Sequence, residues 1–253
     1  MTFTLPIFDV HTDHDDDFSR HKALGRMILE EEPAEIIMGG DFATLDSCSS
    51  YDTHKRCSMG DDMEAVRTGY EHIFGPMNQW NKGRRASKQY SPKTYWLEGN
   101  HEEREKRIRK ADPEGYASLV DFDEMLAPKS IWKHKVRYGQ FATVRGIHYT
   151  HIPLNRMGKP MSLAMLRKMS AGHTVFGHTH YLHCETVPLV GNGNACKMLL
   201  NAPALMRQDG VEHYCKDNTT GWVYGLLRIR PQGATRPFTF DFISTEELET
   251  QYL

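Results

Sequence analysis

The chain has 253 residues, of which 39% are hydrophobic and 25% are charged, so it is long enough to bury a sizeable core and has the composition of neither a disordered nor a fibrous protein. Its 31 lysine and arginine residues nearly balance 33 aspartate and glutamate residues, and the net charge of -2 excludes a global basic field of the kind that drives nonspecific binding to nucleic acid. Five scattered cysteines without a C-x-x-C pair argue against a disulfide framework or a thiolate zinc site.

The amino-terminal segment, MTFTLPIFDVHTDHDDD, does not have the basic region and long apolar run of a secretory signal. No window of the sequence approaches the roughly 18 apolar residues that a membrane-spanning helix needs. With cysteines that are expected to stay reduced, these features predict a cytoplasmic protein, in the host cytoplasm if a bacteriophage encodes it, with no membrane partner.

The first third of the chain alternates strand and helix patterns. Residues 3 to 8, FTLPIF, predict a strand that runs into Asp9. Apolar residues at helical spacing between positions 23 and 28 predict a helix after it, with Asp17 or Ser19 as its cap. Residues 35 to 41, EIIMGGD, predict a second strand. The order strand, helix, strand favours a parallel pair.

The middle of the chain has a weaker pattern. Residues 42 to 92 predict a loop, a helix near 61 to 74 and a basic connector, and we treat the region around 47 to 92 as an insertion in one domain that spans residues 1 to 253. Residues 93 to 98 predict a third strand. Residues 101 to 110 predict a helix with an acidic first turn and a basic last turn, as the helix dipole favours.

The second half is richer in strand patterns. Residues 140 to 152 predict a strand, 162 to 169 a helix, and 173 to 178 another strand. The remaining apolar segments, with a Gly-Asn-Gly-Asn turn at 191 to 194, predict a run of antiparallel strands.

Polar side chains that ligate metals follow five of these strands. In open α/β sheets, ligands bind outside the carboxyl ends of the strands, so we expect these side chains to converge on one dispersed metal site. An Asp or Asn after a strand can instead cap a helix, and only the occurrence of all five motifs in order favours the site. The motifs are Asp9-Val10-His11, Gly40-Asp41, Gly99-Asn100-His101-Glu102, Thr150-His151 and Gly177-His178-Thr179-His180.

The order of these five motifs resembles the signature of the calcineurin-like metallophosphoesterases, which reads D-x-H, G-D, G-N-H-E, H and G-H-x-H. The resemblance runs from about residue 6 to 183, and residues 219 to 229, TTGWVYGLLRI, resemble the tail of the small bacterial and bacteriophage members. It implies an α/β fold, called α+β in some classifications: a four-layer αββα sandwich of two mixed β-sheets flanked by helices.

The resemblance also implies a site with two divalent metal ions. Asp9, His11 and His180 would bind the first ion, and Asp41 would bridge to the second. Asn100, His151 and His178 would complete the second ion's ligands, and His101 would orient the scissile phosphate or protonate its leaving group. Imidazole, carboxylate and amide ligands suit manganese, our first choice, or iron, zinc, cobalt and nickel better than calcium, and magnesium prefers an all-oxygen shell.

One ligand position departs from the family. The family usually has glycine after the histidine of the fourth motif, whereas Ile152 follows His151 here. His148 is the rival ligand, and the two-residue period of a strand allows only one of the two histidines to face the site. We favour His151.

Two cations about 3.5 to 4 Å apart can activate a water molecule and clamp the attacking and leaving oxygens of a phosphoester. The predicted function is therefore a metal-dependent phosphoric ester hydrolase, a phosphomonoesterase or phosphodiesterase that acts on a nucleotide or another small phosphoester. A metal-bridging hydroxide would attack while His101 assists the leaving group. A nuclease acting on DNA or RNA is one alternative. A non-catalytic binding module on the same fold is another, which the presence of His101 and all seven expected ligands disfavours.

The sequence leaves open the roles of several residues outside the motifs. His14, in the acidic run DHDDD, is a candidate for contact with the phosphate or the outer shell of a metal, and Asp46 and Arg104 are candidates for orienting ligands or binding substrate. The segment 81 to 93, NKGRRASKQYSPK, is either a polyanion-binding edge beside the site or an exposed basic loop. Trp222 fits the core or rim better than a stacking platform. The oligomeric state is not predicted.

Overall fold

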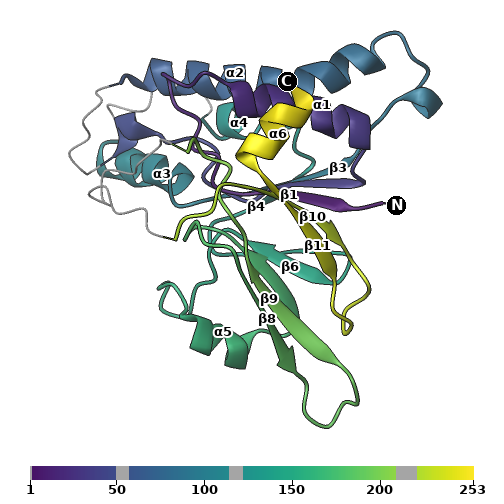
Figure 1. Cartoon of the computed structure of the whole chain (residues 1–253). Helices are drawn as coiled ribbons and strands as arrows, with labels where there is room; N and C mark the ends of the chain where they lie inside the picture. The colour runs from purple at the N-terminus through teal and green to yellow at the C-terminus, as the bar shows by residue number, and fades with distance from the viewer. Residues whose placement is uncertain (1, 50–56, 114–121, 209–220) are drawn as a thin grey trace.

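The computed structural model of the chain describes residues 2–49, 57–113, 122–208 and 221–253 (Figure 1). Part of the predicted insertion, residues 50–56, lies outside these ranges, as do Cys215 and the first two residues of the predicted tail motif. Within the described ranges, no helix combines the length and the apolar character that crossing a bilayer requires.

The first layer of strands is a six-stranded mixed sheet in the order β11-β10-β1-β2-β3-β4. Strands β1 to β4 are parallel, and β10 lies antiparallel to β1 and to β11. The parallel pair β1 and β2 confirms the predicted strand, helix, strand unit. The bounds are β1 (Thr4–Ile7), β2 (Glu35–Met38), β3 (Lys93–Leu97), β4 (His134–Val136), β10 (Gly225–Arg230) and β11 (Thr239–Ser244).

The second sheet has five strands in the order β5-β6-β7-β9-β8. Strands β6, β7 and β9 are parallel, and the two outer strands are antiparallel to their neighbours. The bounds are β5 (Ala142–Val144), β6 (Ile147–Thr150), β7 (His173–Phe176), β8 (His183–Pro188) and β9 (Cys196–Asn201). Two mixed sheets with helices on their outer faces confirm the predicted α/β sandwich.

The helices are unequally shared between the two outer faces (Figure 1). Helices α1, α2 and α6 lie over the six-stranded sheet, whereas α5 lies against the five-stranded sheet. The bounds are α1 (Ser19–Glu31), α2 (Met59–Asn81), α3 (Glu102–Ala111), α4 (Phe122–Leu126), α5 (Leu163–Met169) and α6 (Thr245–Tyr252), with short 3-10 turns η1 (Asp46–Cys48) and η2 (Ala86–Lys88).

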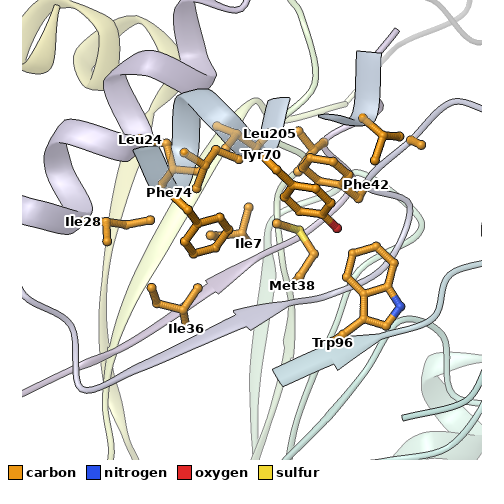
Figure 2. Packing of buried hydrophobic residues seen from close by; sticks show 14 of the residues in the cluster. Ile7, Leu24, Ile28, Ile36, Met38, Phe42, Tyr70, Phe74, Trp96 and Leu205 are labelled. Carbon is orange, nitrogen blue, oxygen red and sulfur yellow. The ribbon is translucent and has the colours of Figure 1, made fainter. Parts of the chain in front are cut away.

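Strands β1 and β2 of the six-stranded sheet are buried on both faces, to which successive strand residues point in turn. In β2, Ile36 points toward α1 and α2, where Leu24 and Phe74 pack against the sheet (Figure 2). The next residue, Ile37, belongs to the core between the two sheets, together with Tyr149 of β6. This continuous apolar character is typical of parallel strands covered on both sides.

Three local predictions were corrected by the structure. Residues 140 to 152 form a hairpin, β5 and β6, rather than one strand, because Arg145 and Gly146 turn the chain with φ values of 49° and 81°. The helix near 61 to 74 is longer than predicted. In α2, Ser58 is the N-cap and forms a capping box with Asp61 in the first turn, and the helix continues through an internal proline. Helix α1 has Phe18, not Asp17 or Ser19, at its N-cap position.

The predicted antiparallel run at the end of the chain is divided between the two sheets. The hairpin of β8 and β9 belongs to the five-stranded sheet, where β9 is parallel to β7. The hairpin of β10 and β11 belongs to the six-stranded sheet, next to β1. Local hairpin signals predict the pairing within each hairpin but not the sheet that the hairpin joins.

Candidate metal centre

The segments that follow β1 and β2 continue side by side beyond the sheet. The backbone N–H of Asp9 donates to the carbonyl of Gly40 at 3.1 Å, and the N–H of His11 donates to the carbonyl of Asp41 at 3.0 Å. This pairing brings Asp9, His11 and Asp41 to one place, at the carboxyl ends of the two strands, as the sequence predicts.

The other strand ends meet them there. The N–H of His178, after β7, donates to Asp9 Oδ2 at 2.9 Å, and the N–H of His101, after β3, donates to Asp41 Oδ1 at 2.9 Å. The loop after β6 joins this assembly because the N–H of Gly177 donates to the carbonyl of His151 at 3.0 Å. The site therefore lies where the carboxyl ends of strands from both sheets come together.

The backbone at this site adopts the left-handed conformation at five of the predicted ligands. In the described ranges, nine non-glycine residues have a positive φ, and five of them are predicted metal ligands. Such a conformation costs an L-residue about 1 to 2 kcal/mol, and its concentration in one place is typical of functional sites. The five are Asp9 (52°), His11 (49°), Asp41 (50°), His178 (72°) and His180 (60°).

The side chains form three overlapping groups in which the potential ligand atoms lie within 4.8 Å of one another. Asp41 belongs to two of the groups, and so does His11, which makes the groups one continuous cluster. The groups are Asp9, His11 and His180; His11, Asp41 and His101; and Asp41, His151 and His178.

Each carboxylate has one oxygen fixed by a backbone N–H and the other turned toward imidazoles. Asp9 Oδ1 lies 3.6 Å from His180 Nε2, and Asp41 Oδ2 lies 3.3 Å from His151 Nε2. Because the oxygens that accept the backbone N–H groups are Asp9 Oδ2 and Asp41 Oδ1, the oxygens that face the cluster keep lone pairs for a cation.

Of the two histidines considered for the fourth motif, His151 lies in the cluster and His148 does not belong to any of the three groups. The Nδ1 of His151 lies 3.1 Å from the carbonyl of Gly39, which accepts a hydrogen bond, while its Nε2 lies 2.9 Å from Asn100 Oδ1. A carbonyl at one ring nitrogen leaves the other as the metal-binding atom. His148 instead pairs through Nδ1 with Thr143 Oγ1 at 2.9 Å.

The electrostatics of the cluster favour cations. Burial opposes the ionisation of Asp9 and Asp41, but neighbouring imidazoles outweigh it and lower the pKa of both carboxyls, that of Asp41 well below its usual range. Burial also lowers the pKa of His151, yet the carboxylate of Asp41, and then that of Asp9, raise it to about 9. Burial and repulsion from Asp41 raise the pKa of Glu102 to about 7. Bound cations would relieve this repulsion among buried carboxylates.

The residues present fit divalent metal ions. Asp9 Oδ1 and His180 Nδ1 are buried and accept or donate no hydrogen bond within the described part of the chain, which is costly for polar atoms in a protein interior. The potential ligands are imidazole nitrogens, carboxylate oxygens and an amide oxygen, without thiolate. This set suits the borderline transition metals that the sequence predicts.

His101 is held by hydrogen bonds at both ring nitrogens. Its Nδ1 lies 2.7 Å from the carbonyl of Thr44, and its Nε2 lies 2.7 Å from Nη2 of Arg104. Since a guanidinium only donates, Nε2 accepts and Nδ1 carries the proton. Arg104 Nη1 also donates to the carbonyl of Thr44 at 3.0 Å. Arg104, predicted as an outer or substrate-binding residue, thus contacts His101 directly.

The other two predicted outer residues lie outside the three groups. His14 is partly exposed, and its Nδ1 lies 2.7 Å from Asp13 Oδ1. Asp46 is buried in η1. Sequence reasoning missed two neighbours of the site: Trp222, whose ring centroid lies 4.3 Å from that of His180, and Glu102, whose carboxylate contacts the Asp41 segment. Only Glu102 had a signal, as the last letter of G-N-H-E.

The basic segment 81 to 93 does not lie beside the site. It connects the end of α2, at Asn81, to the beginning of β3, at Lys93, whereas the site follows the carboxyl end of β3. Figure 1 shows this connection on the side where β1 begins. The side chain of Arg84 lies over the ring of Trp80, 3.7 Å from its centroid. The length of β3 thus separates the basic segment from the cluster.

Comparisons with known proteins add little to this picture. No protein-family model matches the sequence, and no curated protein matches it. Forty-eight chains of solved structures are similar in fold. One of them, a crystal structure with 12% sequence identity, aligns over 80% of this chain and 90% of its own with a TM-score of 0.34. A likeness this weak identifies neither a family nor an activity, so the functional argument rests on the site.

Proposed function

We propose that this protein is a phosphoesterase of the calcineurin-like type that uses two divalent metal ions. The observation that carries the proposal is the position of Asp41, a buried carboxylate shared by two adjacent groups of ligand side chains. A carboxylate that holds two cations at a short separation must occupy such a position. The order of the five sequence motifs supports the same assignment.

The division of the ligands follows the groups. Asp9, His11 and His180 would hold one ion, and His151 and His178, with Asn100 beside His151, would hold the other. Asp41, which shares one group with His11 and another with His151 and His178, would serve both. When bound, two divalent ions supply Lewis acidity for the phosphoryl oxygens and make water nucleophilic at neutral pH.

The chain's own residues would handle the leaving group. His101 belongs to the group of His11 and Asp41, and its Nε2 lies 3.8 Å from Asp41 Oδ2. Its Nε2 accepts from Arg104, so His101 can donate a proton to a leaving oxygen only after Arg104 releases Nε2 and a proton takes its place. Arg104 would then be free to bind a phosphoryl oxygen.

A small substrate, with a nucleotide as the first candidate, is favoured over nucleic acid. The basic segment that would follow a polynucleotide backbone lies at the other end of β3. Trp222, half-buried against His180, is an aromatic side chain placed beside the cluster, where a nucleobase could pack.

Hydrolysis assays with added Mn²⁺ test the proposal. The substrates are p-nitrophenyl phosphate, its bis ester, nucleoside monophosphates, cyclic nucleotides and single-stranded DNA. We expect turnover of a small ester that EDTA abolishes and Mn²⁺ restores. Cleavage of DNA without turnover of any small ester would favour the nuclease instead, and metal binding without turnover of any ester would favour the binding module.

Replacement of His101 by alanine is expected to keep the metal content and to lower the rate on esters with poor leaving groups by about 10²- to 10⁴-fold, because general acid catalysis is lost. p-Nitrophenolate needs little protonation, so its esters should be affected much less. The measurement is kcat for both kinds of ester, with metal content determined on the same samples. Loss of metal from the variant would show that His101 is a ligand instead, as its place in one of the groups allows.

A further inference from the structure

Glu102 is a buried acid whose side chain leaves its own helix. It is the first residue of α3, and only 2% of it is exposed. Its Oε2 accepts from the N–H groups of Asp41 (3.0 Å) and Gly99 (2.9 Å), and its Oε1 accepts from those of Phe42 (2.8 Å) and Ala43 (3.4 Å). In the described ranges, no lysine or arginine forms an ion pair with it. Its two oxygens are therefore held by backbone N–H groups.

The three successive N–H groups of residues 41 to 43 form a concave anion site of the kind that usually binds phosphate. Here the occupant is a carboxylate of the same chain. Asp41 has a φ of 50°, a left-handed conformation that is unfavourable for most L-residues. The hydrogen bonds to Glu102 hold the N–H groups of this segment in place.

A second contact runs in the opposite direction. The N–H of His101, the residue before Glu102, donates to Asp41 Oδ1. The side chain of Glu102 thus holds the backbone of Asp41, while the backbone of His101 holds the side chain of Asp41. Gly99 permits this close approach, since a Cβ there would lie 2.1 Å from Asp41 Oδ1 and 2.7 Å from Glu102 Oε2.

We propose that Glu102 is a positioning residue that fixes Asp41 so that it lies in the ligand group of His11 and also in that of His151 and His178, and that it joins the β2 and β3 ends of the site into one unit. The inference rests on the proposed function of Asp41 as the shared ligand. Glu102 would act only through Asp41 and would contact neither metal nor substrate.

The test compares Glu102→Gln with Glu105→Gln. Glutamine keeps one acceptor oxygen and places an NH₂ group against two N–H donors, so at least two of the hydrogen bonds are lost. Glu105 is a matched control because it lies in the same helix, is also 2% exposed, and pairs with Arg109 at 2.6 Å rather than with the site. Three quantities are measured for both variants and the wild type: Mn²⁺ binding by equilibrium dialysis, amide hydrogen exchange of residues 41 to 43, and the melting temperature.

We expect Glu102→Gln to weaken Mn²⁺ binding by about 10- to 100-fold, the usual effect of losing a group that orients a ligand, and to speed exchange at residues 41 to 43. Glu105→Gln should lower the melting temperature without changing either. Wild-type metal affinity and exchange in Glu102→Gln would overturn the inference and leave the proposed function standing. Equal losses in both variants would also overturn it, because they would reflect general destabilisation.

A wild-type measurement and a second variant distinguish failure of this inference from failure of the proposed function and from misfolding. If wild-type protein binds no Mn²⁺, the proposed function fails and this inference fails with it. If Glu102→Gln does not fold, Glu102→Asp replaces it, since aspartate keeps both acceptor oxygens but is one methylene too short. Folded Glu102→Asp should bind Mn²⁺ more weakly than wild type, and unchanged affinity would overturn the inference.

Discussion

Replacement of Asp41 by asparagine is expected to remove metal from the protein and to lower kcat/KM by about 10³-fold or more. The loss of a charged ligand shared by two cations removes several kcal/mol of transition-state stabilisation, and each 1.4 kcal/mol, roughly, is a tenfold change in rate. Asparagine has the size of aspartate and tolerates the left-handed conformation of this position, so the backbone should persist. Its oxygen can still accept from the N–H of His101, which leaves an NH₂ group facing His151.

Metal content and kcat/KM with Mn²⁺ measure this effect, and Asp62→Asn is the matched control. Asp62 is also 2% exposed, but it accepts hydrogen bonds from Ser47 and lies outside the three ligand groups. The control should keep both metal and activity. An Asp41→Asn protein with full metal content and wild-type kcat/KM would refute the shared-ligand role.

The second large effect is expected at His151. Its replacement by alanine should remove one of the two metal ions and lower kcat/KM by about 10²-fold, which corresponds to a loss of nearly 3 kcal/mol in transition-state stabilisation. The imidazole Nε2 lies 2.9 Å from Asn100 Oδ1 and 3.3 Å from Asp41 Oδ2, so its loss also leaves the half-buried Asn100 oxygen and the buried Asp41 oxygen without this neighbour.

The matched control is His148→Ala, three residues earlier. His148 pairs with Thr143 across the β5–β6 hairpin and belongs to none of the ligand groups, so its replacement should leave metal binding and activity unchanged. Metal stoichiometry and kcat/KM are compared for the two variants. If His148→Ala loses the metal and His151→Ala keeps it, the assignment of the fourth motif is wrong.

The convergence of the predicted ligands on one site can be predicted from the sequence because two local patterns are strong. Short apolar runs that end in Gly or Asp mark the strands, and the parallel order of β1, β2 and β3 places Asp9, Asp41 and Asn100 at the same edge. His178 and His180 follow β7 by the same rule. The two-residue period of a strand lets only one of His148 and His151 face the site, and of the two the structure places His151 in the cluster.

Features that depend on distant contacts were not predictable. The backbone N–H of Asp41, a residue with left-handed backbone, donates to Glu102, 61 residues away in the sequence. A glutamate in the first turn of a helix normally indicates an interaction with the helix dipole, and nothing local shows that its side chain reaches another strand end. The contact of Trp222 with His180 likewise forms only when distant segments of the chain assemble.

The most direct test of the central claim is diffraction from crystals soaked in MnCl₂, with data collected at a wavelength where manganese scatters anomalously. The account predicts two adjacent anomalous peaks. One should lie among Asp9, His11 and His180, the other among Asn100, His151 and His178, with Asp41 in contact with both. No peak inside these groups, or a single peak that Asp41 does not touch, would contradict the account.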